Sequence, residues 1–460
     1  MAKPKRKMVV KKLPLEKEII AVPLPTLPVI ASESHGDDAK GKGNLGMGTS
    51  VLSLQCPYCQ SEDFVKRGTR LKKGGKTQLY FCRACKRTFT PSWFKGRRHS
   101  WQVILDAMSY YNLGFSLEQT GKVMKEKFGV EIQGSTLSSW LIKYGQLCAY
   151  KRMRSFAVRF YSPYEVIETC TLAHRQLYRF RYHKAKCKFI LADDFKHYKF
   201  GPLKDFLENV CAETPHQYFQ RPAAEVEPAL GKQSLGDQIL RASESPLKFS
   251  KTEMIVRAKK NYATALAGLV FQGVSDNKQR HEALQKFFIA NDSVTVATEV
   301  PVYLRREDLS HMRTQLGFQL YKKNSKFKTL NSKQIQNSKS EIPNEYELLP
   351  EDEIPKLITG HIDFLQIRNG AIHILDYKSG AAKERPIEQL TLYALALSRL
   401  SGLRLFHFKC AWFDENDYFE FFPLHVVYKR GRGRKRIKTI EGIYNLNEQV
   451  NKIENLRPVV

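Results

Sequence analysis

The sequence has no run of about 18 apolar residues, the length that a membrane-spanning helix requires. It has no internal repeat. Its Lys-rich start is followed by apolar residues, as in a secretion signal, but Pro23, Pro25 and Pro28 would break the helix that such a signal needs. These absences argue against membrane, repeat and secreted proteins and favour a globular chain.

Cysteine is sparse, with nine in 460 residues, and the number is odd. Five cysteines occur singly and four form two C-x-x-C pairs. This usage fits a reducing compartment better than a disulfide framework. A composition of 42% hydrophobic and 26% charged residues is that of an ordinary globular protein, and the length suggests about three domains of ~150 residues.

Acidic residues are few relative to basic ones, because 46 Asp and Glu against 75 Lys and Arg leave a net charge of +29. This charge exceeds what solubility requires and favours a polyanionic partner, most often nucleic acid. A basic protein of the ribosomal or membrane-surface type is the alternative.

Two C-x-x-C pairs, Cys56 with Cys59 and Cys82 with Cys85, are separated by 22 residues that alternate in part between apolar and polar. Each pair places two sulfurs on one concave side, and a hairpin would bring both pairs to one tetrahedral Zn²⁺. We therefore predict a zinc ribbon with one structural zinc. Four unrelated buried cysteines are an alternative, and a redox C-x-x-C would not explain the second pair.

The same stretch is strongly basic, with 12 Lys or Arg and two acidic residues between Cys56 and Arg98. Such a charge density is typical of a surface that contacts phosphates. We expect Arg83, Lys86 and Arg87 to bind DNA.

The residues that follow show helical periodicity in three pieces. Ser116-Leu-Glu-Gln119 predicts a capping box, Gly129 a helix end, and Ser135 the start of the third helix. Two short helices joined by a tight turn are the helix-turn-helix pattern, and Ser138 and Lys143 would face DNA. A three-helix bundle without DNA contacts is the alternative.

Residues from about 55 to 145 resemble the N-terminal DNA-binding part of insertion-sequence transposases. The resemblance raises a DDE catalytic site as an alternative, with KFILADDFKHY as its first strand and Asp193 or Asp194 at the strand end. No convincing second and third acid precedes the expected linker. A second zinc site is a further alternative. Cys170 with His174, and His183 with Cys187, are each four residues apart, the spacing that places two side chains on one face of a helix.

The string GHIDFLQIRNGAIHILDYKSG, residues 360–380, predicts a β-hairpin. Asn369-Gly370 is a strong signal for a two-residue type I′ turn between alternating strands. This turn sets the register, with Arg368 opposite Ala371.

That register places Asp363 directly opposite Asp376, with Lys378 on the same face and opposite His361. Two facing carboxylates repel each other and destabilise the hairpin unless a cation lies between them. A divalent metal ion is the expected cation.

The hairpin resembles the PD-(D/E)xK nuclease superfamily, and within it the RecB-like and Cas4-like branch. The signature of this branch is matched by Gly360 with Asp363, Asp376 with Lys378, and Gln389 with Tyr393 on a helix. The branch also carries a helical His and a further acid, which His281 and Glu299 fit. The resemblance covers about 250–428, with a long insertion at about 305–355.

The resemblance implies an α/β restriction-endonuclease-like fold that hydrolyses DNA phosphodiesters with Mg²⁺ or Mn²⁺. It implies three sets of roles: Asp363, Asp376, the carbonyl of Tyr377 and His281 bind the metal; Lys378 orients water or stabilises the phosphorane; Gln389 and Tyr393 hold the DNA backbone or brace the site. A DNA-binding regulator with an inactive nuclease fold is the alternative.

We thus expect a multidomain DNA nuclease linked to a mobile element or recombination, in the cytoplasm with the nucleoid or in a eukaryotic nucleus. We expect DNA as partner, no membrane, and a homo-oligomer or transposition or recombination proteins as further partners. The expected segments are a disordered basic arm (1–50), zinc ribbon (51–98), helix-turn-helix (99–150), connecting segment (151–212), linker (213–248), nuclease domain (249–428) and basic tail (429–460).

Overall fold

The computed structural model describes residues 56–72, 75–90, 99–144, 151–192, 197–220, 235–249, 255–258, 261–274, 279–323, 346–428 and 443–445. The expected basic arm and the basic run 429–438 lie outside these residues. No helix in the described part of the chain has the length and apolar character needed to cross a membrane.

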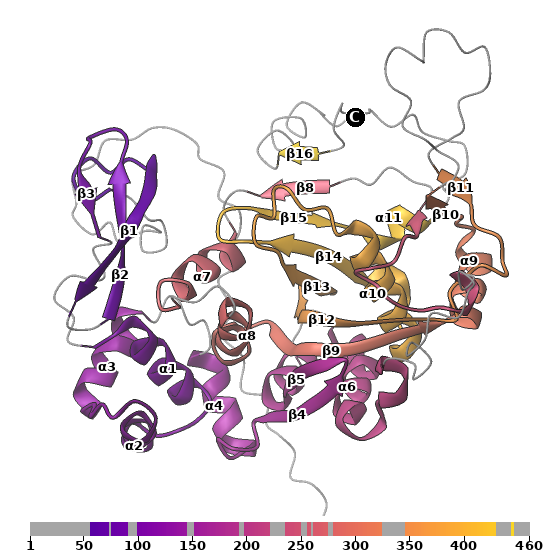
Figure 1. Cartoon of the computed structure of the whole chain (residues 1–460). Helices are drawn as coiled ribbons and strands as arrows, with labels where there is room; N and C mark the ends of the chain where they lie inside the picture. Colours follow the sequence, from indigo (N-terminus) through magenta and orange to yellow (C-terminus); the bar gives the residue numbers. More distant parts are fainter. Residues whose placement is uncertain are drawn as a thin grey trace, which may run out of the picture. The chain divides into compact units, whose positions relative to one another are not determined.

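The fold is a mixed α/β fold around a 10-stranded sheet that combines parallel and antiparallel pairs (Figure 1). The strands, in spatial order, are β16 (Ile443–Asn445), β8 (Ile255–Ala258), β15 (Tyr418–Phe421), β14 (Phe408–Phe413), β13 (Ala371–Tyr377), β12 (Leu357–Arg368), β9 (Thr295–Arg305), β5 (Gln176–His183) and β4 (Ile167–His174), and β6 (Ile239–Arg241) pairs with the start of β12. The three residues of β16 fall within the expected basic tail, so that part of the tail belongs to the sheet.

Helices cover both faces of this sheet. Successive residues of a strand point to opposite faces, and those of the central strands pack in two different hydrophobic clusters. Leu365 of β12 packs in the cluster that contains the long apolar face of α10 (Ile387–Ser401). The neighbouring Phe364 packs in the cluster that contains α7 (Tyr262–Val270) and α8 (Arg280–Asn291). The central strands are therefore buried on both sides. The remaining short elements of this region are η8 (Leu405–His407) and α11 (Pro423–Val427).

The expected connecting segment (151–212) is part of the main sheet, which corrects our domain boundaries. Strands β4 and β5 form an antiparallel hairpin, and β5 pairs with β9 through Arg181 and Thr298. The helices of this segment are α4 (Lys151–Phe160), α5 (Lys184–Leu191) and α6 (Gly201–Glu213), with η3 (His197–Phe200) before α6.

The expected linker (213–248) also contains ordered elements: η4 (His216–Phe219), η6 (Leu235–Asp237) and β6, of which β6 runs parallel to β12. Residues 221–234 lie outside the described part of the chain. The boundary that we expected at residue 249 is therefore wrong, because pairing between distant strands leaves no signal in local composition.

The expected insertion (305–355) contains α9 (Arg306–Leu316), β10 (Leu320–Lys323) and β11 (Tyr346–Leu348). Strand β10 pairs with β11 and with β7 (Lys248–Phe249) in a small separate sheet. The low-complexity part, 324–345, lies outside the described residues.

Two alternatives that the sequence left open for residues 170–198 do not agree with the structure. The candidate DDE strand, residues 188–198, begins with the second half of α5, because a short apolar run fits a helix as well as a strand. Cys170 lies on β4 and not on a helix, and it forms a disulfide with Cys211 of α6, so it is not a ligand of a second zinc site. Cys170 and Cys211 are therefore paired, although the sequence suggested that they were single cysteines. Asp193 and Asp194 lie outside the described residues.

Three helices, α1 (Trp101–Asn112), α2 (Leu117–Phe128) and α3 (Gly134–Lys143), follow the predicted pattern. The capping box at Ser116 is present, and Gly129 ends α2 with φ of 64°. The third helix begins at Gly134, one residue before the position that we expected.

Helix α1 packs against α8 of the main fold (Figure 1). The buried Asn112 side chain donates to Asn291 Oδ1 at 2.7 Å, and the Asn291 amide donates to Ser109 Oγ at 2.7 Å. The indole N–H of Trp101 donates to the carbonyl of Leu269 at 2.9 Å. These helices therefore share a hydrophobic cluster with the main fold and do not form a domain separated by a linker.

Strands β1 (Phe64–Lys72), β2 (Gly75–Cys82) and β3 (Thr88–Phe89) form a three-stranded sheet of their own. The rings of Phe64, Tyr80 and Phe89 contact one another and form its small apolar core. The four cysteines of the C-x-x-C pairs lie beside this core.

Candidate functional site

The hairpin of β12 and β13 has the predicted turn and register. Asn369 and Gly370 have φ of 51° and 69°, as the left-handed positions of a type I′ turn require. The strands pair antiparallel with Arg368 opposite Ala371. The predicted hairpin is therefore confirmed.

Asp363 and Asp376 follow one step beyond the last paired residues of this hairpin, and both are buried, with 7% and 3% of their surface exposed. Asp363 Oδ2 accepts a hydrogen bond from the backbone N–H of Tyr377 at 2.9 Å. Asp376 Oδ2 lies 2.9 Å from Lys378 Nζ. The hairpin thus brings two carboxylates and one ammonium group together, as strand parity predicted.

His281 and Glu299 reach the same place from other elements. His281, in the first turn of α8, has its Nε2 2.9 Å from Asp363 Oδ2. Glu299 lies on β9 with φ of 53°, a conformation that residues other than glycine rarely adopt and that often marks functional sites. The ligand atoms of His281, Glu299 and Asp363 all lie within 4.8 Å of one another.

Gln285 joins these two residues and had no signal in the sequence. Its side-chain amide donates to Glu299 Oε1 at 2.6 Å and lies 3.2 Å from His281 Nε2. Gln285 is one helical turn after His281 on α8, so its position follows from the helix once His281 is placed. Its side chain orients the Glu299 carboxylate.

The electrostatics of the cluster reflect crowding of negative charge. Burial, and then the charge of Asp363, raises the pKa of Asp376 to about 8, and Lys378 offsets only part of this. Burial and Asp363 likewise raise the pKa of Glu299 to about 7. Burial opposes the charged form of His281, but Asp363 and the other carboxylates outweigh it and raise the pKa of His281 to about 9.

These donors fit a hard divalent cation. Carboxylate oxygens with one imidazole suit Mg²⁺ or Mn²⁺, whereas a zinc or copper site usually has more nitrogen or sulfur donors. A bound divalent cation would also compensate the repulsion that keeps protons on Asp376 and Glu299. The residues present therefore fit a metal of this class.

Tyr393 links two other residues of the predicted signature, because its ring packs against Gly360 and its hydroxyl contacts Gln389. A Cβ on Gly360 would lie 2.2 Å from Cε1 of Tyr393, so the ring requires glycine there. Tyr393 is buried on α10, and its hydroxyl accepts a hydrogen bond from the Gln389 amide at 3.0 Å. The predicted i, i+4 pair thus braces the start of β12 before Asp363.

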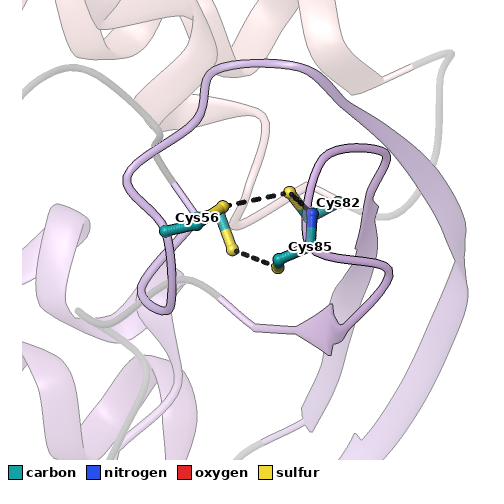
Figure 2. Close-up of side chains that lie close together, drawn as sticks. Cys56, Cys82 and Cys85 are labelled. Atoms are coloured by element: carbon teal, nitrogen blue, oxygen red, sulfur yellow. Dashed lines mark hydrogen bonds between the residues drawn. The ribbon is translucent and has the colours of Figure 1, made fainter.

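The four cysteines near the N-terminus come together at the end of the β1–β2 hairpin. Cys56 Sγ lies 3.5 Å from Cys85 Sγ, and Cys59 Sγ lies 3.5 Å from Cys82 Sγ. Figure 2 shows the labelled side chains of Cys56, Cys82 and Cys85 grouped around one point. Tetrahedral zinc with Zn–S bonds of about 2.3 Å needs sulfurs roughly 3.8 Å apart, so this arrangement fits zinc.

The residues that we expected to bind DNA lie on two elements. Arg83, Lys86 and Arg87 surround the second C-x-x-C turn and are exposed, whereas on α3 Lys143 is exposed and Ser138 is half-buried. They do not form one cluster with the carboxylates. Their role in DNA binding stays a prediction.

Residues 273–421 match the family model of the PD-(D/E)XK nuclease superfamily. This range contains the hairpin, α8, β9 and α10, and so all the residues of the carboxylate cluster. No curated protein and no solved structure matches the chain. Residues 273–421 are therefore similar to the PD-(D/E)XK nuclease superfamily, whose members are typically metal-dependent nucleases.

Proposed function

We propose that the protein is a metal-dependent deoxyribonuclease of the RecB-like and Cas4-like type that hydrolyses DNA phosphodiester bonds. The observation that carries this proposal is the convergence of Asp363, Asp376 and Lys378 from one hairpin with His281 and Glu299 from two other elements.

In this proposal Asp363, Asp376, His281 and the carbonyl of Tyr377 hold one Mg²⁺ or Mn²⁺ ion, with Glu299 as an additional ligand. The ion, when bound, makes a coordinated water more acidic and neutralises charge on the scissile phosphate. The residues themselves fix the position of the carboxylates and exclude bulk water, because the acids are almost fully buried.

Lys378 supplies the positive charge of the site. Burial disfavours its ammonium, but Asp376 outweighs this and raises the pKa of Lys378, so it is protonated at neutral pH. Its Nζ can donate hydrogen bonds to the attacking water or to a phosphate oxygen whose negative charge increases in the transition state. Gln389 and Tyr393 brace the strand that carries Asp363.

We further propose that the N-terminal part directs this activity to DNA. Four cysteines would hold one structural zinc, and the basic side chains Arg83, Lys86 and Arg87 beside it, with Ser138 and Lys143 of α3, would contact DNA. The packing of α1 on α8 supports this proposal, since it holds the first of the three N-terminal helices against the helix that carries His281. A role in a mobile element or in recombination, in the cytoplasm or nucleus, follows from the transposase-like resemblance.

Incubation of the purified full chain with end-labelled single- and double-stranded DNA tests the proposed activity. We expect cleavage with Mg²⁺ or Mn²⁺ and none with EDTA. Intact DNA under every metal condition, combined with binding of that DNA, would instead indicate a DNA-binding regulator with an inactive nuclease fold.

A further inference from the structure

Two strands outside the range that matches the superfamily lie against the strands of the carboxylate cluster. Strand β6 runs parallel to the start of β12, with Arg241 beside Thr359, the residue before Gly360. Strand β5 pairs with β9, which carries Glu299. Both strands therefore place side chains at the edge of the proposed active site.

Arg241 and Tyr178 contact each other across this edge. The guanidinium of Arg241 donates to the hydroxyl oxygen of Tyr178, and the amide of Gln176 donates to the same oxygen at 2.5 Å. Because this oxygen already accepts two hydrogen bonds, the hydroxyl proton of Tyr178 can only donate to a further acceptor.

Arg241 differs from its neighbours in its partners. Arg175 lies 4.0 Å from the carboxylate of Glu244, and Arg179 and Arg181 lie 3.5 Å and 3.4 Å from Glu282. Arg241 has no carboxylate within ion-pair distance in the described part of the chain, and the Tyr178 hydroxyl is its side-chain partner there. No described carboxylate therefore neutralises its charge.

The pair contacts β12 close to the proposed metal ligand Asp363. The ring of Tyr178 stacks on that of His361 with 3.6 Å between centroids and 9° between planes, and His361 is two residues before Asp363 on β12.

The platform under Tyr178 is held rigidly by a chain of three histidines. His174 Nδ1 lies 2.9 Å from His361 Nε2, and His174 Nε2 lies 2.9 Å from His216 Nδ1. The ring of Phe219 stacks on His174 with centroids 4.1 Å apart. Tyr178 and Arg241 are therefore positioned in advance, which lowers the entropic cost of binding a ligand.

We propose that Arg241 and Tyr178 form a binding site for a backbone phosphate of the DNA strand, next to the phosphate that is cleaved. This inference rests on the proposed nuclease function and names a contact for its substrate. An arginine without a carboxylate partner binds phosphate oxygens by two parallel hydrogen bonds, and the Tyr178 hydroxyl adds a third donor.

The test is the salt dependence of binding of a short fluorescent single-stranded DNA to the full chain in EDTA, where no cleavage occurs. Loss of one phosphate contact should reduce the slope of log K against log salt by about 0.7. We expect this reduction in Arg241→Gln, none in Arg241→Lys, and weaker binding at unchanged slope in Tyr178→Phe, which keeps the ring on His361. The matched control, Arg175→Gln, should leave the slope unchanged.

With Mg²⁺, Arg241→Gln should raise KM for the same strand more than it lowers kcat, since a phosphate contact made before and during the reaction is uniform binding. An unchanged slope in Arg241→Gln, or an equal reduction in Arg175→Gln, would overturn the inference. If Arg241→Gln does not fold, a lower affinity of Tyr178→Phe than of wild type supports the inference and an equal affinity overturns it. Because binding is measured in EDTA, absence of cleavage by the wild type would defeat the proposed activity and leave this test valid.

Discussion

The cysteine cluster and the carboxylate cluster are two candidate metal sites that are built in opposite ways. The four cysteines come from residues 56–85 and lie in a small sheet with few buried side chains. The carboxylates come from α8, β9 and one hairpin, inside a large sheet that is covered on both faces. We therefore expect a metal to stabilise the fold of the first region and, in the second, to serve the proposed reaction.

The largest expected effect is on zinc. Cys82→Ser should reduce zinc from one ion per chain to none and unfold β1–β3, because structural zinc contributes about 10–16 kcal/mol in peptides of this kind. Elemental analysis and circular dichroism measure this, with Cys410→Ala, a buried free cysteine of β14, as control. Loss of Mg²⁺-dependent cleavage of non-specific DNA in Cys82→Ser would show that the two sites are not independent.

Removal of the ammonium group from the second site should slow the reaction strongly and leave metal binding intact. We expect Lys378→Ala to lower kcat about 10²–10³-fold, the cost of one well-placed transition-state donor. Lys409→Ala, which removes a lysine paired with Glu420 on the neighbouring strands, should retain activity. A Lys378→Ala protein as active as the control would remove Lys378 from the proposed mechanism.

Prediction from the sequence is accurate where the signal is local. The Asn369-Gly370 turn sets the register of the hairpin, and this register by itself brings Asp363 and Asp376 together. The two C-x-x-C pairs predict the cysteine cluster for the same reason. Within each of these two sites, one hairpin joins the residues that come together.

Prediction fails where partners are distant in the chain. Pairing of β5 with β9 and of β6 with β12 depends on side-chain packing that no spacing records, so local composition makes the segments containing Tyr178 and Arg241 resemble a connector and a linker. The same limit applies to the disulfide between Cys170 and Cys211. His281 and Glu299 are identified in the sequence only through the superfamily resemblance.

A third prediction concerns Lys186, a fully buried residue that joins the connector to the core of the second region. Its Nζ donates to the carbonyls of Ile289 and Thr295 at 2.8 and 2.9 Å, and burial lowers its pKa from 10.5 to about 7. Between pH 7 and 10.5 the unfolded chain keeps the proton of Lys186 and the folded chain releases it. The free-energy cost of burying the charged ammonium therefore has its full value below pH 7 and decreases as the pH rises toward 10.5.

The free energy of unfolding of the wild type, relative to that of Lys186→Met, should therefore rise by up to about 1.4 kcal/mol per pH unit between pH 7 and 10. Denaturant titrations of both proteins at several pH values measure this difference. Parallel pH profiles for the two proteins would show that the charge on Lys186 is not affected by folding.

The smallest expected effect is at the contact between α1 and α8. Asn291→Ala leaves the buried Asn112 without its acceptor and should lower the free energy of unfolding by about 1–3 kcal/mol. Asn209→Ala, on the exposed side of α6, should change it by less than about 0.5 kcal/mol. Equal stabilities of the two variants would argue that α1–α3 unfold independently of the main fold.

The most direct test of the carboxylate cluster as the active site is a Mn²⁺ titration of wild type and Asp376→Ala, with free Mn²⁺ measured by electron paramagnetic resonance and cleavage of labelled DNA measured in the same samples. The wild type should bind Mn²⁺ and cleave DNA, and Asp376→Ala should do neither, because it lacks one carboxylate of the cluster. Mn²⁺-dependent cleavage that persists in Asp376→Ala would contradict this account and place the active site elsewhere in the chain.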